Sequence, residues 1–132
     1  MEISSLIKKL RIQPGQRLLF LNAPDGYIST LGQLPEGIEV VDVPDGIFDF
    51  VQVFVKSLSE LEKQAPVAIK AVKYDGLFWI CYPKQSSGIK TDINRDTGWS
   101  VVQQAGLRPV TQVAIDDTWS ALRFRPVERV GS

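Results

Sequence analysis

Apolar residues follow two different spacings along this chain, one typical of helices and one typical of buried strands. Helical spacing at the start predicts a short amphipathic helix with a stripe formed by Ile3, Leu6, Ile7 and Leu10. Later apolar runs have few polar interruptions, as expected for strands of a parallel sheet that is covered on both faces. The predicted strands cover residues 17–21, 38–42, 48–55, 77–82, 110–115 and 119–125.

Helical patterns separate most of these strands. They cover residues 27–34, 58–72 and a segment from Asp92 or Asp96 to Ala105, with a kink or a new start at Pro66. Strands that alternate with helices and close with a hairpin predict an α/β fold. We expect a three-layer, Rossmann-like, mostly parallel sheet of about six strands with a C-terminal antiparallel hairpin. The length fits a single α/β domain over residues 1–132.

Local sequence also predicts one turn and the position of the last strand in the sheet. The Tyr74-Asp75-Gly76 segment has turn-forming residues and predicts a turn before strand 77–82. The last strand, 119–125, carries two arginines and is followed by Pro126. Charged residues and proline suit an edge strand, so we expect this strand at the edge of the sheet.

The pairing of strands 38–42 and 48–55 has two possible solutions. Only residues 43–47 separate them, whereas a parallel crossover usually needs a dozen residues. The Asp45-Gly46 pair is also a common hairpin sequence. These strands are therefore either antiparallel or joined by an extended return.

Charge and residue usage argue against several classes of function. Lys plus Arg and Asp plus Glu each number 15, so the zero net charge argues against a nucleic-acid partner. The chain has no histidine, which removes imidazole catalysis, and its single cysteine, Cys81, can form no internal disulfide. We expect no metal site. With no signal peptide and no apolar run near ~20 residues, we expect a cytoplasmic protein and no membrane partner.

Ligands in open α/β sheets bind beyond the carboxyl ends of the strands. The candidates for ligand binding there are Asn22, Asp25, Tyr27, Asp42, Lys84, Ser86 and Ser87. The segment 84–88 combines a cation, two hydroxyls and a glycine, which suits a small anion, although a structural loop capped by serine is the alternative. Asp42 follows a strand about twenty residues beyond the first loop, where a ribose-binding acid sits in such folds, although a solvated strand end is the alternative. No catalytic group is identified.

Several segments resemble class I S-adenosylmethionine-dependent methyltransferases. The first helix, the Pro-Gly-Gln-Arg segment at 14–17, the apolar strand and the polar turn after it resemble the opening of that fold. Residues 44–51 resemble its fourth-strand entry, residues 72–79 the turn before its fifth strand, and Gly106-Leu107 with the hairpin its closing strands. The resemblance covers nearly the whole chain and implies a methyltransferase-like fold. The chain also resembles a family of small uncharacterised bacterial proteins, which implies no established activity. That resemblance rests on Lys84, Ser86-Ser87-Gly88, Arg95-Asp96, Asp116, Trp119-Ser120, Leu122 and Phe124.

Two departures from the methyltransferase pattern shape the functional expectation. Residues 22–27 replace the acidic, glycine-rich loop that holds the cofactor's amino-acid end, and a strand–helix unit is missing before Phe48. We therefore expect a reduced fold and a non-catalytic protein with no cofactor, S-adenosylmethionine included. It would bind a small anionic ligand or a protein partner at the carboxyl ends of the strands. The alternatives are a minimal S-adenosylmethionine-dependent methyltransferase and an interaction module with exposed aromatics such as Tyr27.

Overall fold

The computed structural model describes residues 5–94 and 98–130. A six-stranded sheet with the order β2-β1-β3-β4-β6-β5 forms its centre. The first four strands in this order are parallel, and β6 and β5 close the sheet as an antiparallel pair. The predicted α/β architecture is therefore confirmed. The strands are β1 (Arg17–Leu21), β2 (Glu39–Val41), β3 (Phe48–Phe54), β4 (Val72–Pro83), β5 (Leu107–Ala114) and β6 (Trp119–Pro126).

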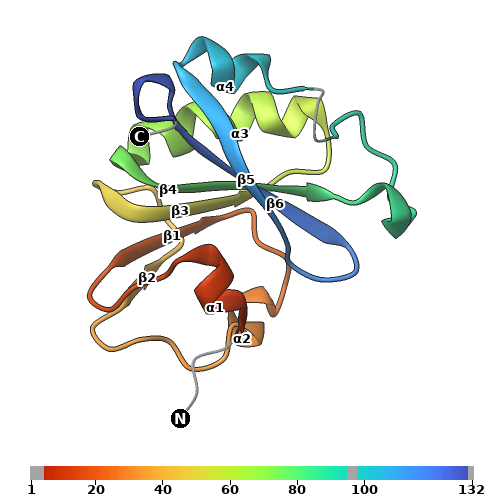
Figure 1. Cartoon of the computed structure of the whole chain (residues 1–132). Coiled ribbons are helices and arrows are strands. Elements are labelled where there is room, and N and C mark those ends of the chain that lie inside the picture. The colour runs from red at the N-terminus through yellow and green to blue at the C-terminus, as the bar shows by residue number, and fades with distance from the viewer. Residues whose placement is uncertain (1–4, 95–97, 131–132) are drawn as a thin grey trace.

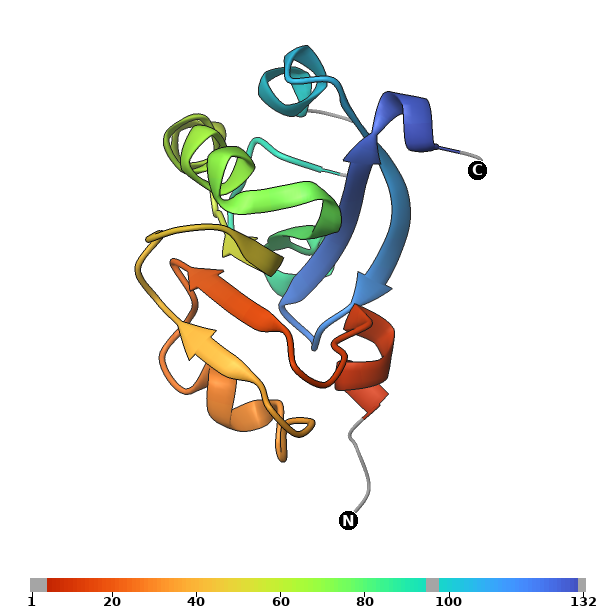
Figure 2. The same cartoon turned by 90° about the vertical axis from the view of Figure 1, so that its left-hand side faces the viewer.

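Helices cover both faces of the sheet (Figures 1 and 2). One face packs against α1 (Ser5–Leu10) and α2 (Tyr27–Thr30), and the other against α3 (Leu58–Ala71) and α4 (Ser100–Gln104). Strand β3 supplies both cores because successive side chains point to opposite faces. Its Phe50 and Phe54 face α1 and α2, while Val51 and Val53 face α3, and all four are fully buried.

Helix α3 runs through Pro66 as one element. Its N-cap is Ser57, whose hydroxyl accepts a hydrogen bond from the Glu60 amide at 3.2 Å. The predicted new start at Pro66 is wrong. Buried Ala65 and Ala68 lie on either side of the proline, and this tertiary packing supports the helix where one backbone hydrogen bond is lost.

Strand β2 pairs with β1 and not with β3. The register is parallel, with Leu19 opposite Val41, and β3 pairs with the other edge of β1. The hairpin is therefore wrong, and the extended return is confirmed. Residues 43–47 contain no helix or strand, and they reach back past β1 to the start of β3.

Strand β6 lies between β4 and β5, so the expected edge position is wrong and β5 is the edge. Its arginines do not face open solvent: Arg123 is only 9% exposed, and Arg125 Nε donates to the Asp75 carboxylate at 2.9 Å. Trp119 faces the α1 core, whereas Leu122 and Phe124 face the α3 core. Trp119 is buried, at 7% exposure, and its ring meets the Phe54 ring edge-on with 5.1 Å between the ring centroids.

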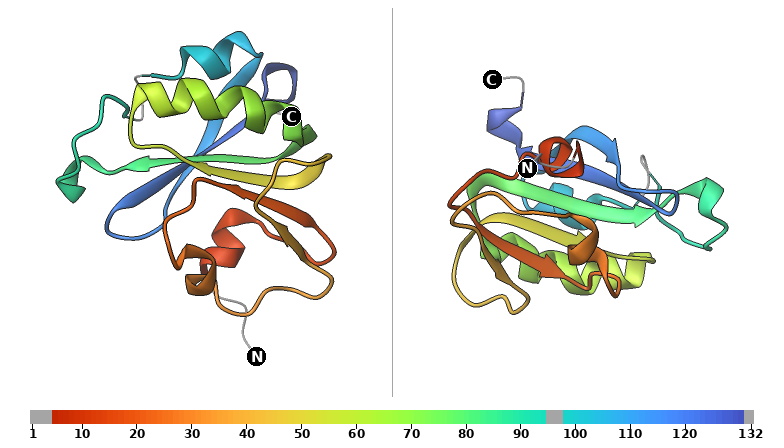
Figure 3. Two further views of the ribbon diagram at one scale, coloured as in Figure 1. Left: turned by 180° about the vertical axis from the view of Figure 1, so that it is seen from behind. Right: turned by 90° about the horizontal axis from the view of Figure 1, so that it is seen from below.

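Other predicted bounds differ because tertiary pairing extends or shortens local patterns. The expected turn at Tyr74-Asp75-Gly76 lies inside β4, which begins at Val72. The 27–34 helix ends at Thr30. Helix α4 begins only at Ser100, so the expected start at Asp92 is wrong, because the Asp92 carboxylate accepts a hydrogen bond from the Leu58 amide at the start of α3. The other expected start, Asp96, falls outside the described residues, as does Arg95. After β4, a loop with the turn η1 (Gln85–Ser87) projects beyond the sheet (Figure 3). Within the described ranges no helix has the length and apolarity needed to cross a membrane.

Candidate functional site

The turn after β1 ties two neighbouring strand ends together. Asn22 adopts a left-handed backbone conformation with φ 59°, and its side-chain nitrogen donates to the Phe54 carbonyl at 2.7 Å. Gly26 has φ 80°, which glycine adopts without a steric penalty. The Tyr27 amide then donates to the Pro24 carbonyl at 3.0 Å, and α2 begins.

Tyr27 fixes this turn to the core beneath it. Its ring is 5% exposed, and its hydroxyl donates to Gln52 Oε1 at 3.0 Å. Burial, with a smaller contribution from Cys81, raises the pKa of Tyr27 well above its ordinary value. Burial likewise raises the pKa of the Cys81 thiol to about 12. The expectation of an exposed Tyr27 is therefore wrong, because the hydroxyl finds its partner inside the core.

Two cavities flank the turn, each of about 390 Å³. The cavity on the β2 side, here the β2-side cavity, brings together Asn22, Asp25, Tyr27 and Asp42 from our sequence candidates. The cavity on the β3 side, here the β3-side cavity, shares Asn22 and Asp25 with it. The further residues that line the β3-side cavity are Ala23, Pro24, Lys56, Glu60, Ile89, Thr118 and Trp119.

Carboxylates outnumber cations around these two cavities. Asp25, Asp42 and Glu60 face a single lysine, Lys56, among the described lining residues. Glu60 Oε1 also accepts a hydrogen bond from the Lys56 amide at 2.6 Å. This hydrogen bond holds the Glu60 carboxylate at the cavity and at the start of α3. The pair of cavities therefore favours a ligand that carries positive charge.

A third cavity of about 460 Å³ lies beyond the end of β4 and the start of β6, and we call it the β4–β6 cavity. Lys84 and Ser86 line it, whereas Ser87 does not. The Ser87 hydroxyl donates to the Lys84 carbonyl at 2.6 Å and accepts from the Ile89 amide at 3.2 Å. Ser87 therefore holds the loop together, as the structural alternative proposed. The remaining lining residues are Tyr82, Pro83, Gln85, Asn94, Gln112 and Ser120.

Sequence patterns missed several lining residues. Glu60 belongs to a Ser-x-x-Glu capping pattern, which concealed its position at a cavity. Trp119 starts a hairpin strand, and Gln112 lies on the edge strand where its side-chain nitrogen donates to the Tyr82 hydroxyl at 2.6 Å. Only the strand order brings these residues to the carboxyl ends of β3 and β4. Within residues 5–94 and 98–130, no cluster of three or more potential metal-ligating side chains occurs.

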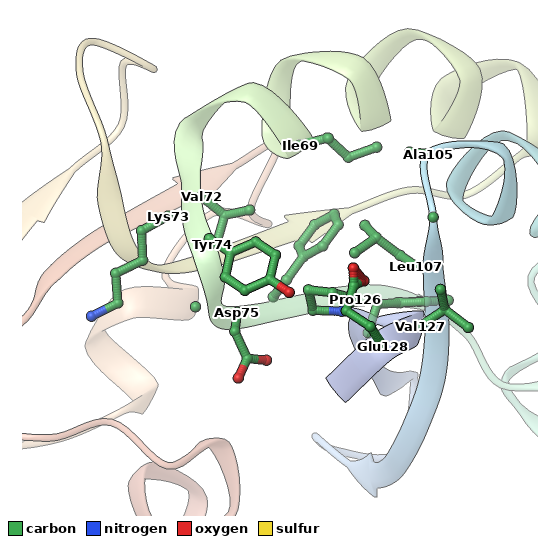
Figure 4. A pocket seen from close by; sticks show the side chains of 14 residues that line it. Ile69, Val72, Lys73, Tyr74, Asp75, Ala105, Leu107, Pro126, Val127 and Glu128 are labelled. Carbon is green, nitrogen blue, oxygen red and sulfur yellow. The ribbon is translucent and has the colours of Figure 1, made fainter. Parts of the chain in front are cut away.

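A fourth cavity, of about 440 Å³, lies at the opposite end of the sheet (Figure 4). It lies where β4 begins and β6 ends, and its apolar lining includes Val72, Phe78 and Leu107. Tyr74 stands at its rim with 68% of the residue exposed. It lies away from the carboxyl ends of the parallel strands, so it is not the candidate site.

Known protein structures with a similar architecture were found by comparison. No protein-family model and no curated protein sequence matches the chain. A S-adenosylmethionine-dependent methyltransferase from Aquifex aeolicus is similar in structure, with a TM-score of 0.58, 16% identity, and coverage of 90% of this chain and 86% of that one. The fold is methyltransferase-like.

Two further methyltransferase structures agree with this result. A ribosomal protein methylase from Lactobacillus delbrueckii subsp. bulgaricus has a TM-score of 0.53 and 10% identity, with coverage of 92% of this chain and 74% of that one. Phosphoethanolamine N-methyltransferase 2 from Haemonchus contortus, in complex with S-adenosyl-L-methionine, has a TM-score of 0.55 and 12% identity, with coverage of 92% and 36%. At these identities the similarity concerns the fold.

These neighbours correct three expectations drawn from the sequence. We expected a non-catalytic binding protein, not an enzyme, and no cofactor. The three structural neighbours are methyl-transferring enzymes. The Aquifex aeolicus protein is described as dependent on S-adenosylmethionine, and the Haemonchus contortus protein is in complex with it. These findings favour the methyltransferase alternative. The expectations failed because they gave one glycine-poor turn more weight than the retained strand order around it.

Proposed function

We propose that this protein is a minimal S-adenosylmethionine-dependent methyltransferase. The observation that carries the proposal is the acidic pair of cavities at the carboxyl ends of β1, β2 and β3 in a methyltransferase-like sheet. Each cavity has about 390 Å³, within the range of roughly 300–1,000 Å³ typical of small-molecule sites. Their surplus of carboxylates complements the sulfonium and ammonium charges of the cofactor.

The residues of the turn suit this ligand. Asp42 follows β2 and lines the β2-side cavity, and in this proposal its carboxylate accepts hydrogen bonds from the ribose hydroxyls. Asp25 and Glu60 offset positive charge on the β3 side. A Cβ added at Gly26 would meet no atom within 4 Å, so the turn leaves its backbone open although it holds a single glycine. When bound, S-adenosylmethionine supplies an electrophilic methyl group.

The β4–β6 cavity is the proposed place for the methyl acceptor. The Lys84 amide donates to the Thr118 carbonyl at 2.7 Å, and these two residues line different cavities. The β3-side cavity and the β4–β6 cavity are therefore neighbours. Holding two reactants side by side supplies most of the catalysis that a methyl transfer needs, and Lys84 and Ser86 orient the acceptor in this proposal.

Calorimetric titration with S-adenosylmethionine tests the cofactor site. We expect a Kd of about 10 µM, equivalent to about −7 kcal/mol, and weaker binding of S-adenosylhomocysteine, which lacks the sulfonium charge. Asp42→Asn should raise the Kd about tenfold or more. Asp117→Asn is the matched control because Asp117 is exposed in the hairpin turn and lines none of the three cavities. Absence of binding at about 1 mM, or equal affinity for both variants, contradicts the proposal.

Two finer expectations join the proposal, one from the apolar pattern of the sequence and one from the sequence resemblance. They are a cytoplasmic location and membership of the small bacterial family identified from residues such as Lys84 and Trp119. A close homologue with the same 84–88 and 116–124 segments in a bacterial genome would support both. Homologues that carry a secretion signal would contradict the location.

A further inference from the structure

Arg123 is a buried arginine with no ion-pair partner among the described residues. It lies on the α1-facing side of β6, is 9% exposed, and pairs in register with Trp79 on β4 and Thr111 on β5. Within the described residues its Nε is enclosed and has no acceptor. Buried charges are normally paired, because an unpaired one loses its hydration without compensation.

A second arginine lies next to this position. The Trp79 indole nitrogen donates to the Leu10 carbonyl at 3.1 Å, which fixes the end of α1 over the strand position beside Arg123. Arg11 follows directly, with a left-handed φ of 65°. That conformation ends helix α1, because the Arg11 amide donates to the Lys8 carbonyl and the Ile12 amide to the Ile7 carbonyl, each at 3.1 Å.

The nearby acid is already occupied by other arginines. Asp75 accepts both Arg125 Nε and Arg125 Nη2 at 2.9 Å, and Arg129 Nε at 3.4 Å. Within the described ranges no ion pair reaches Arg11 or Arg123. Burial, followed by repulsion from Arg11 and Arg125, lowers the pKa of Arg123, and attraction to Asp75 offsets only part of this effect.

We propose that Arg11 and Arg123 form a binding site for the phosphate group of a small molecule. Only Nε of Arg123 is enclosed without a partner, so its terminal nitrogens keep access to a ligand. Planar guanidinium groups bind tetrahedral oxyanions through paired hydrogen bonds, and Thr111 offers a hydroxyl on the neighbouring strand. None of these three residues lines the cavities of the proposed cofactor or acceptor, so this site is independent of the methyltransferase proposal.

Thermal unfolding of the full chain in inorganic phosphate tests the site. Sodium chloride at matched ionic strength is the reference, because simple screening also weakens repulsion between arginines. A Kd of about 1 mM gives a phosphate-specific rise in Tm of about 4 °C at about 10 mM phosphate. Equal curves in the two salts overturn the proposal.

Three variants locate the effect. Arg123→Leu should abolish the phosphate-specific rise, whatever its Tm in chloride. Arg11→Gly removes the guanidinium and suits the left-handed conformation, so it should fold normally and weaken phosphate binding at least about fivefold. Arg129→Ala is the control and should keep the full rise, since Arg129 is half exposed and contacts Asp75 instead. A rise that survives in both Arg123→Leu and Arg11→Gly overturns the proposal.

Discussion

Gln52 and Arg123 are both buried on the face of the sheet that packs against α1 and α2, and the protein surrounds them differently. Gln52 is fully buried and uses both ends of its amide. Its oxygen accepts from the Tyr27 hydroxyl at 3.0 Å, and its nitrogen donates to Cys81 Sγ at 3.1 Å. Arg123 lacks any such partner for Nε among the described residues.

The difference separates a structural group from a binding group. A buried polar group with all its partners stabilises one arrangement of its neighbours, here the anchor that holds the turn after β1. A buried group without partners lowers stability until something external supplies them. On this one face of the sheet, Gln52 therefore supports the proposed cofactor turn. Arg123, on the same face, still needs a hydrogen-bond acceptor for its Nε.

The largest expected effect comes from Trp119, whose ring links the strand of Arg123 to the strand of Gln52. It lies on the strand of Arg123 and meets Phe54, on the strand of Gln52, edge-on at 5.1 Å. Trp119→Ala should lower the free energy of unfolding by about 3–5 kcal/mol, the usual cost of removing a large buried aromatic. Urea unfolding measures it, with exposed Val127→Ala as control. A loss of unfolding free energy close to that of the control would show that the Trp119 ring does not hold these two strands together.

Matched leucine substitutions test the comparison directly. Gln52→Leu leaves the Tyr27 hydroxyl without its acceptor, so we expect a loss of about 1–3 kcal/mol. Arg123→Leu removes a charge that has no partner, so in phosphate-free buffer it should lose less than Gln52→Leu, and replacement of such charges by apolar groups can even stabilise. Urea unfolding of both variants gives the ranking. The reverse order would mean that Arg123 is a structural group like Gln52.

The smallest expected effect concerns Asp75, the acid that pairs with Arg125 beside Arg123. The hydrogen bond from Arg125 is the main cause that lowers the pKa of Asp75 below its ordinary 3.8. A lowered folded-state pKa stabilises the fold above the unfolded-state value, and this contribution is lost as the pH falls through the folded-state pKa. Melting temperatures from about pH 6 to about pH 3 should fall less steeply for Asp75→Asn than for wild type. Identical slopes would contradict the pairing.

Local sequence predicted the elements that local apolar runs determine. Residues 17–21 match β1, because a run of buried apolar residues leaves few alternatives. The Tyr74-Asp75-Gly76 segment lies inside β4 but interrupts its pairing with β3, because the register shifts between Val72 and Leu77 and Asp75 has a left-handed φ of 56°. The contact between Asp75 and Arg125 holds this irregular segment against β6, so the predicted turn is an irregularity within the strand. The predicted edge position of β6 was wrong because the sequence does not distinguish a buried arginine from an exposed one.

The candidate site was partly predictable for the same reason. Asn22, Asp25 and Asp42 follow predicted strands, so their convergence on one cavity follows from a parallel sheet. Glu60 and Trp119 reach the β3-side cavity from the start of a helix and from an antiparallel strand. No local sequence pattern predicts that these two residues line the same cavity. The enzyme and cofactor expectations were wrong because a missing glycine motif says little about a fold that many sequences share.

The brevity of β2 has a consequence for local opening. This strand has 3 residues, pairs only with β1, and carries Val40 with 39% of the residue exposed. Short edge strands open locally at a small fraction of the global free energy, so their amides exchange with solvent early. Asp42 follows this strand, so the proposed ribose contact depends on the segment of the sheet that frays most easily. A bound cofactor would therefore slow hydrogen exchange at residues 39–41 more than in β3 or β4.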